Sequence, residues 1–264
     1  ATSLLCCPLL QSQQITMAGV ANAVHGGGVA EEDEKAKSQV EPETALKEVT
    51  GEAVTEDEKG KGKEETEVEI EAKSGVSFPV RLDDGKQLTT VGLRKKGVLG
   101  IGLKIYAFGI YADSGKLKES MRAKFGTASE KPTKALYDAV IDSDVDVVVR
   151  LVIVFGGLTM SMVRKNFSEG LGASIKKLTG GQKNDELVNK VMGAASDSIK
   201  LSSGSVIEIS SFPGYTLQTK VKGEVVSKLE SELLCRAYFH LYLGDEPFDK
   251  EAKEIFGRTL LSIF

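Results

Sequence analysis

A cation and a phenol within an apolar, glycine-rich run are the side chains of this chain best suited to chemistry. The run is Val91–Asp113, VGLRKKGVLGIGLKIYAFGIYAD, and it contains Arg94 and Tyr106. Burying a charge among apolar residues costs free energy unless something pairs with it. One interpretation is therefore an anionic or carbonyl-bearing apolar ligand. The other, which the residues alone favour, is an edge strand whose Arg and Lys side chains reach out to water.

Arg94 and Tyr106 belong to adjacent strand segments that could fold against each other at the glycine-rich turn between them. A guanidinium offers a two-pronged donor to a carboxylate, and a phenol adds a third donor. Together they could fix an acid headgroup while apolar walls hold its tail. The sequence alone does not show that the two side chains meet.

Other kinds of site find little support in this sequence. The cysteines, Cys6, Cys7 and Cys235, and the histidines, His25 and His240, have no metal-site or catalytic spacing. No P-loop, GxSxG or HExxH motif occurs. We therefore expect no metal and no cofactor.

The charge of the chain is unevenly distributed. Residues 1–30 carry no charged side chain, and residues 31–73 hold 16 acidic and 7 basic residues, within a total net charge of -4. The rest is mildly basic and has no dense basic run, so nucleic-acid binding is not expected. The longest apolar run, 147–158, is too short and too interrupted to span a bilayer.

Composition divides the chain into three parts. Residues 1–30 are acid-poor and contain Ser, which is typical of a plastid or mitochondrial transit peptide or its remnant, or of a disordered terminus. Residues 31–65 are rich in Glu, Lys, Thr and Gly, which predicts an acidic disordered linker. Residues 66–264 have enough Val, Ile, Leu and Phe for one folded, ligand-binding domain.

Strand and helix patterns alternate through this domain. Alternating or β-branched apolar residues predict strands, and turn signals predict the hairpins between them, over 66–72, 78–94, 97–113, 144–155, 205–212 and 215–229. Apolar residues at spacings of three and four predict helices over 117–126, 132–143, 159–178, 185–199, 228–243 and a closing helix capped by Asp249. This order predicts an α+β domain, with a mostly antiparallel sheet covered by helices on one face.

The segment GLRKKGVLGIGLKIYAFGIY resembles the pattern of plant chalcone isomerases, in which a GxR segment precedes a long strand that ends in GxY. The resemblance continues through VVVRLVIVFGGLTMSMVRKNFSEGL and SSGSVIEISSFPGYTLQT and covers most of 75–264. The chain is most similar to the non-catalytic, fatty-acid-binding branch of that family. This implies an open-faced β-sandwich with a ligand cleft between sheet and helices, and a place in the chloroplast stroma.

The resemblance also implies roles for single residues. Arg94 matches the substrate-holding arginine of the isomerases, and Tyr106 takes the place of a sheet threonine that positions water. The helix tyrosine that stabilises the enolate corresponds to Met162, and a helix asparagine corresponds to Glu169, so both could line the pocket. Losing a phenol donor removes stabilisation of a developing oxyanion.

The function expected from this resemblance is binding of free fatty acids in the plastid, without catalysis. Arg94 and Tyr106 would hold the carboxylate. The alternatives are a chalcone isomerase and a non-catalytic auxiliary protein that binds chalcones or flavonoids. The sequence does not give the oligomeric state, and it predicts no nucleic-acid partner and no integral membrane association.

Overall fold

The structure is a computed structural model that describes residues 67–98, 101–127, 129–193 and 195–263. The predicted transit segment 1–30 and linker 31–65 lie outside the described residues, as does the first position of the predicted domain.

One antiparallel sheet of six strands dominates the fold, in the order β10-β9-β8-β5-β4-β3. Its strands, in chain order, are β3 (Gln87–Val98), β4 (Ile101–Ala112), β5 (Val147–Ile153), β8 (Val206–Phe212), β9 (Thr216–Val221) and β10 (Glu224–Glu230). β3 pairs with β4, and short turns join β8 to β9 and β9 to β10. This arrangement confirms the predicted α+β class and the antiparallel sheet.

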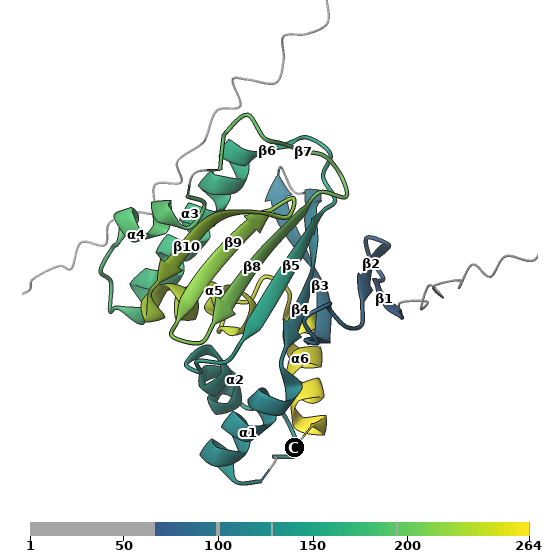
Figure 1. Ribbon diagram of the computed structural model, residues 1–264, viewed down its shortest axis with the longest axis vertical. Coiled ribbons are helices and arrows are strands. Elements are labelled where there is room, and N and C mark those ends of the chain that lie inside the picture. The colour runs from purple at the N-terminus through teal and green to yellow at the C-terminus, as the bar shows by residue number, and fades with distance from the viewer. Residues whose placement is uncertain (1–66, 99–100, 128, 194, 264) are drawn as a thin grey trace, which may run out of the picture. The chain divides into compact units, whose positions relative to one another are not determined.

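Helices pack against one face and one end of this sheet, and in Figure 1 they lie behind, beside and below its strands. They are α1 (Ser114–Phe125), α2 (Lys134–Ile141), α3 (Met160–Leu178), α4 (Asp185–Lys190), α5 (Glu232–Leu243) and α6 (Lys250–Ser262). The main core lies between the helices and the sheet, and alternate residues of β4 enter it from Tyr106 to Ala112. The alternation of a strand thus places Tyr106 on the helical side.

The described residues cover only part of the opposite face of the sheet. A hairpin of β1 (Val68–Glu71) and β2 (Val76–Pro79) pairs there, and Phe78 packs with Leu93 and Ala107 in a small second core. Farther along the same face, Arg150 forms an ion pair with Glu208, its register partner on β8, at 3.5 Å. Arg150 is therefore a salt-bridged residue of the sheet.

The long helix α3 follows the sequence pattern closely. Thr159 caps it by accepting a hydrogen bond from the Met162 amide. The apolar stripe that repeats every three or four residues is buried along the whole helix, at Met160, Val163, Phe167, Leu171 and Ile175. This stripe fixes which side of α3 faces the sheet, and so which residues can line a cavity there.

The helix predicted over 185–199 is wrong in length, because α4 ends at Lys190. The carbonyl of Val191 accepts hydrogen bonds from the side chains of Thr219 and Ser227 instead of continuing the helix. Gly193 then takes a φ of +44° against the backbone of Val226. Contacts with β9 and β10, far away in the sequence, thus end the helix.

A short pair of strands, β6 (Leu158–Thr159) and β7 (Lys200–Leu201), flanks this region.

Candidate functional site

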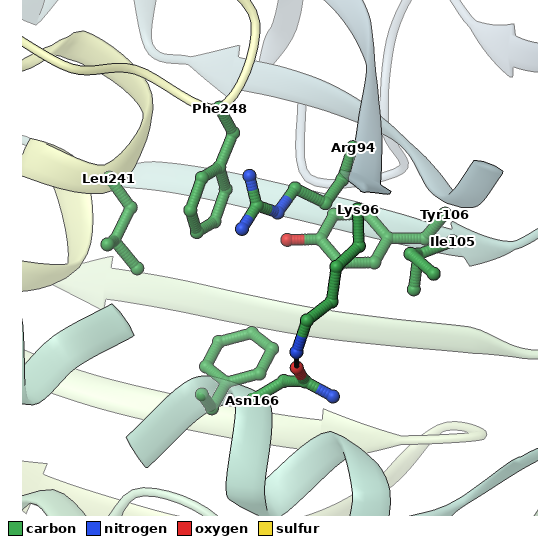
Figure 2. Close-up of a pocket in the computed structure, with 8 residues that line it drawn as sticks. Arg94, Lys96, Ile105, Tyr106, Asn166, Leu241 and Phe248 are labelled. Atoms are coloured by element: carbon green, nitrogen blue, oxygen red, sulfur yellow. Dashed lines mark hydrogen bonds between the residues drawn. The ribbon is translucent and has the colours of Figure 1, made fainter. Parts of the chain in front are cut away.

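The register of β3 and β4 places Arg94 directly opposite Tyr106. The register shifts between Arg94 and Lys95, which indicates a β-bulge at this point. Bulges re-aim the side chains beside them. Arg94 and Tyr106, on neighbouring strands, therefore lie side by side, and both line one cavity (Figure 2).

Arg94 is a half-buried cation that stacks on an aromatic ring. Its guanidinium carbon lies 3.8 Å from the centroid of the Phe248 ring, a distance suited to a cation–π contact. Among the residues that the structure describes, no Asp or Glu forms an ion pair with Arg94. Stacking uses the flat face of the guanidinium and leaves its N–H groups, which lie in the plane, for an anion.

Asp249 fixes the position of this aromatic ring. Its carboxylate caps α6 by accepting from the amides of Glu251 and Ala252, and its other oxygen accepts from the Leu93 amide at 3.1 Å. The same aspartate therefore joins the start of α6 to the strand residue before Arg94. Gly92 permits this close packing, because a Cβ there would lie 2.6 Å from the Ala252 side chain. Phe248, directly before Asp249, is held beside Arg94 as a result.

Tyr106 begins a group of three buried phenols. Burial raises the pKa of the Tyr106 hydroxyl well above its ordinary value, the neighbouring Tyr242 adds to the rise, and Arg94 opposes it. The hydroxyls of Tyr242 and Tyr238 lie 3.4 Å apart, and burial raises the pKa of both. Tyr106 is thus a neutral hydrogen-bond donor at physiological pH.

Two small cavities meet at Tyr106. The first has a volume of about 40 Å³ and is lined by Arg94, Lys96, Ile105, Tyr106, Asn166, Phe167, Leu241 and Phe248. The second, of about 30 Å³, shares Ile105, Tyr106, Asn166 and Phe167 and is otherwise apolar, with Leu151, Ile153, Leu158, Val163 and Ile207. A cationic, donor-rich cavity therefore adjoins an apolar one between the sheet and α3.

The residues predicted on α3 lie elsewhere. Met162 is 44% exposed, Glu169 is also exposed, and neither lines either cavity. Val163, one position after Met162, lines the apolar cavity, and Gly170 lies against Leu241 and Phe248 of the cavity wall. The expected positions were therefore one residue away from the buried side of the helix.

Sequence reasoning missed Lys96, Asn166 and Phe248 as residues of this site. Lys96 follows another lysine, Lys95, a pairing typical of solvated surface, and its side chain is half exposed. Asn166 precedes Phe167 of the apolar stripe, which was the available signal that it borders the cavity. For Phe248 the signal was its place before the predicted cap Asp249, although nothing in the pattern linked it to Arg94.

The site offers donors for an anion and little else. Its polar side chains are one guanidinium, one ammonium, one phenol and one amide, and none of the lining residues is Asp, Glu, His or Cys. Carboxylate, imidazole and thiolate bases are therefore missing from the lining, whose groups able to exchange a proton are Lys96 and Tyr106. Within the described part of the chain, no group of three or more potential ligands could hold a metal ion, and no helix is long and apolar enough to cross a bilayer.

Comparisons with known proteins agree with this architecture. The sequence profile described as chalcone isomerase-like matches residues 72–256. Chalcone isomerase-like protein 1 of Humulus lupulus is 56% identical over 197 residues, which are 74% of this chain and 92% of that protein. Fatty-acid-binding protein 1 of Arabidopsis thaliana is 39% identical over 191 residues, 71% of this chain and 68% of that protein.

A solved structure matches as well. The crystal structure of an Arabidopsis thaliana fatty-acid-binding protein superposes with a TM-score of 0.70 at 38% identity, covering 75% of this chain and 98% of that one. The matched profile spans most of the described sheet and helices. The chain therefore belongs to the chalcone isomerase-like family.

Proposed function

We propose that this protein binds free fatty acids without catalysing a reaction, and that Arg94 and Tyr106 hold the carboxylate. The single observation that carries the proposal is that Arg94 lines the cavity without a carboxylate partner among the described residues. A buried or half-buried cation is costly unless it is paired, so an acid ligand would supply what the protein does not. The Tyr106 phenol beside it is neutral and can donate.

The surroundings of this pair support an acyl chain. The cavity beyond Tyr106 is lined almost entirely by aliphatic and aromatic side chains of β4, β5, β8 and α3. Two relatives that align with much of this chain carry the name fatty-acid-binding protein. A headgroup between Arg94 and Tyr106 would leave the tail to enter this apolar space.

The test is to identify the lipid that the protein retains. We expect mass spectrometry after denaturing extraction to find free fatty acid with the purified wild-type chain, and much less with Arg94→Ala. The Arg150→Ala variant is the matched control, because Arg150 is ion-paired on the opposite face of the sheet. Equal retention by the Arg94 and Arg150 variants would exclude the carboxylate role of Arg94.

The absence of catalysis is part of the proposal. The cavity lining holds no acid, histidine or cysteine, and Met162, at the position expected for a catalytic phenol, is exposed. We expect a chalcone to cyclise no faster with the protein than in buffer. Turnover clearly above that spontaneous rate would overturn this part of the proposal.

A second candidate is a non-catalytic protein that binds chalcones or flavonoids. It is favoured by the 56% identity to a relative named chalcone isomerase-like protein 1, and by the rings of Phe167 and Phe248 in the cavity wall. A neutral polyphenol would leave Arg94 without an ionic partner, which is why the fatty acid is preferred. Competition of a chalcone against a bound fatty acid ranks the two ligands.

We also propose that the protein works in the chloroplast stroma. The support is the acid-poor, Ser-containing composition of residues 1–30. Fluorescence of the full chain, fused at its C-terminus to a fluorescent protein and expressed in leaf cells, tests this. Signal within chloroplasts is expected, and signal confined to the cytosol would contradict it.

A further inference from the structure

The two cavities are too small for the ligand that their chemistry favours. Their volumes are about 40 and 30 Å³, whereas pockets for drug-sized ligands measure roughly 300–1,000 Å³. An acyl chain can therefore enter only if a wall moves. Four residues line both cavities and therefore separate them: Ile105, Tyr106, Asn166 and Phe167. Joining the two cavities into one requires at least one of these side chains to move.

Three of these four residues are held by packing, and the fourth is held by polar contacts at the surface. Tyr106 and Phe167 are 8% and 7% exposed, and Ile105 packs against the main core. Asn166 is exposed. Moving Asn166 therefore costs less buried apolar area than moving any of the other three.

A chain of polar contacts holds Asn166 over the cavity. Lys96 Nζ donates to Asn166 Oδ1 at 2.6 Å (Figure 2). Asn166 Nδ2 donates to the Met162 carbonyl at 2.8 Å. Glu169, one turn away on α3, has its carboxylate 3.8 Å from Lys96 Nζ. The Lys96–Asn166 bond thus links β3 to α3 across the first cavity, and both of its members line that cavity.

We propose that the Lys96–Asn166 bond is the latch of this site and that Lys96 is its second cation for the ligand. This inference rests on the proposed binding of a carboxylate. An arriving carboxylate replaces Asn166 as the acceptor for Lys96 while Arg94 takes the same headgroup. Asn166 then swings free, and α3 separates from β3 enough for the chain to pass between Tyr106 and Phe167.

The partly exposed position of the latch suits this role. An exchange of hydrogen-bond partners at a wet surface costs little net free energy, because water compensates in both states. A ligand that lacks a carboxylate cannot make the exchange. Lys96 therefore links opening of the site to recognition of the charged headgroup.

Stopped-flow binding of a naturally fluorescent polyene fatty acid tests the latch, with Lys96→Met, Asn166→Ala and Asn166→Asp variants. We expect Asn166→Ala to raise the association and dissociation rates at least threefold each, with little change in affinity. Asn166→Asp puts a carboxylate opposite Lys96 and should slow association at least threefold. Lys96→Met should weaken binding of the acid about tenfold but leave the affinity for its methyl ester unchanged.

Lys95→Met is the matched control, because Lys95 carries the same charge next to Lys96, is exposed and does not line the cavity. The latch is overturned if the Lys96 and Asn166 variants bind at the rates and affinity of Lys95→Met while the wild-type chain binds the acid. In that case the proposed function stands. A wild-type chain that does not bind the acid overturns both proposals.

Discussion

Two cations of the same region, one directly before β3 and one within it, differ in whether the protein supplies a carboxylate partner. Lys86, directly before β3, is 6% exposed and lies between two carboxylates, 2.5 Å from Asp84 and 3.1 Å from Asp146. Arg94, within β3, lines a cavity and has an aromatic ring instead of a carboxylate. Lys86 is paired within the protein, whereas Arg94 still has N–H groups that can donate to a ligand.

The pKa of Lys86 shows what such pairing does. Burial by itself would lower the pKa of this lysine, but hydrogen bonds to Asp84 and Asp146 outweigh burial and raise it. The ammonium therefore ties the loop before β3 to Asp146, just ahead of β5. A buried cation therefore indicates an anionic ligand only when no carboxylate of the protein is paired with it. We expect stability to depend on Lys86 and ligand affinity to depend on Arg94.

The largest effect is expected for Arg94→Ala on the affinity for a fatty acid. A hydrogen bond to a charged group contributes about 1.5–3 kcal/mol, so the dissociation constant should rise roughly 10- to 150-fold. Titration calorimetry measures it. Arg94→Lys is the control that keeps the charge but loses the two-pronged donor and much of the stacking. Its dissociation constant should lie between those of the wild-type chain and Arg94→Ala. An affinity unchanged in Arg94→Ala would remove the distinction between the two cations.

Lys86→Met should lower the stability of the fold and leave the affinity for a fatty acid unchanged. Removing the ammonium takes the ion pair away from one oxygen of Asp146. The other oxygen of Asp146 is already buried without a hydrogen-bond partner among the described residues. We expect the free energy of unfolding to fall by about 1–3 kcal/mol, measured by urea denaturation, with fatty-acid affinity unchanged. If the variant lost affinity and kept its stability, Lys86 would belong to the site.

A smaller change is expected for Tyr106→Phe, which removes one neutral donor and keeps the ring. The loss of about 0.5–1.5 kcal/mol corresponds to roughly a 2- to 12-fold rise in the dissociation constant. The change should be confined to the acid and absent for the methyl ester. Equal losses for acid and ester would mean that Tyr106 contributes shape and not a hydrogen bond.

The smallest effect concerns alkaline pH. Burial raises the pKa values of Tyr106, Tyr238 and Tyr242, so in the folded protein these phenols keep their protons above pH 10, where unfolded tyrosines lose theirs. The unfolded state then binds fewer protons, and stability falls as the pH rises. Tyr242→Phe should make the fall between pH 9.5 and roughly 11 less steep by about one proton. An unchanged slope would contradict the burial of a neutral phenol.

Much of the fold could be predicted because local patterns and long-range packing agree. The stripe of α3 and the cap at Asp249 are properties of neighbouring residues, and both are confirmed. The helix predicted over 185–199 was wrong, because the partners of Val191 come from β9 and β10. No local pattern contains those contacts.

The site was less accessible from the sequence. Arg94 and Tyr106 could be paired in principle, since the sequence predicts that their two strands fold against each other, and the register bears out that they are neighbours. Met162 and Glu169 were one position off, because a helix turns about 100° per residue and a shift of one residue moves a side chain out of the cavity. Phe248 and Asn166 reach the cavity through tertiary packing, which a single sequence does not encode locally.

The central claim is that Arg94 is free to bind a carboxylate. The most direct measurement is the affinity of the wild-type chain and of Arg94→Ala for one long-chain fatty acid and for its methyl ester, by titration calorimetry in the same buffer. We predict that the wild-type chain prefers the acid at least a hundredfold, and that Arg94→Ala lowers this preference at least tenfold and keeps only the share that Lys96 and Tyr106 contribute. A wild-type chain that binds the two equally, or an Arg94→Ala variant that keeps the preference, would contradict the claim.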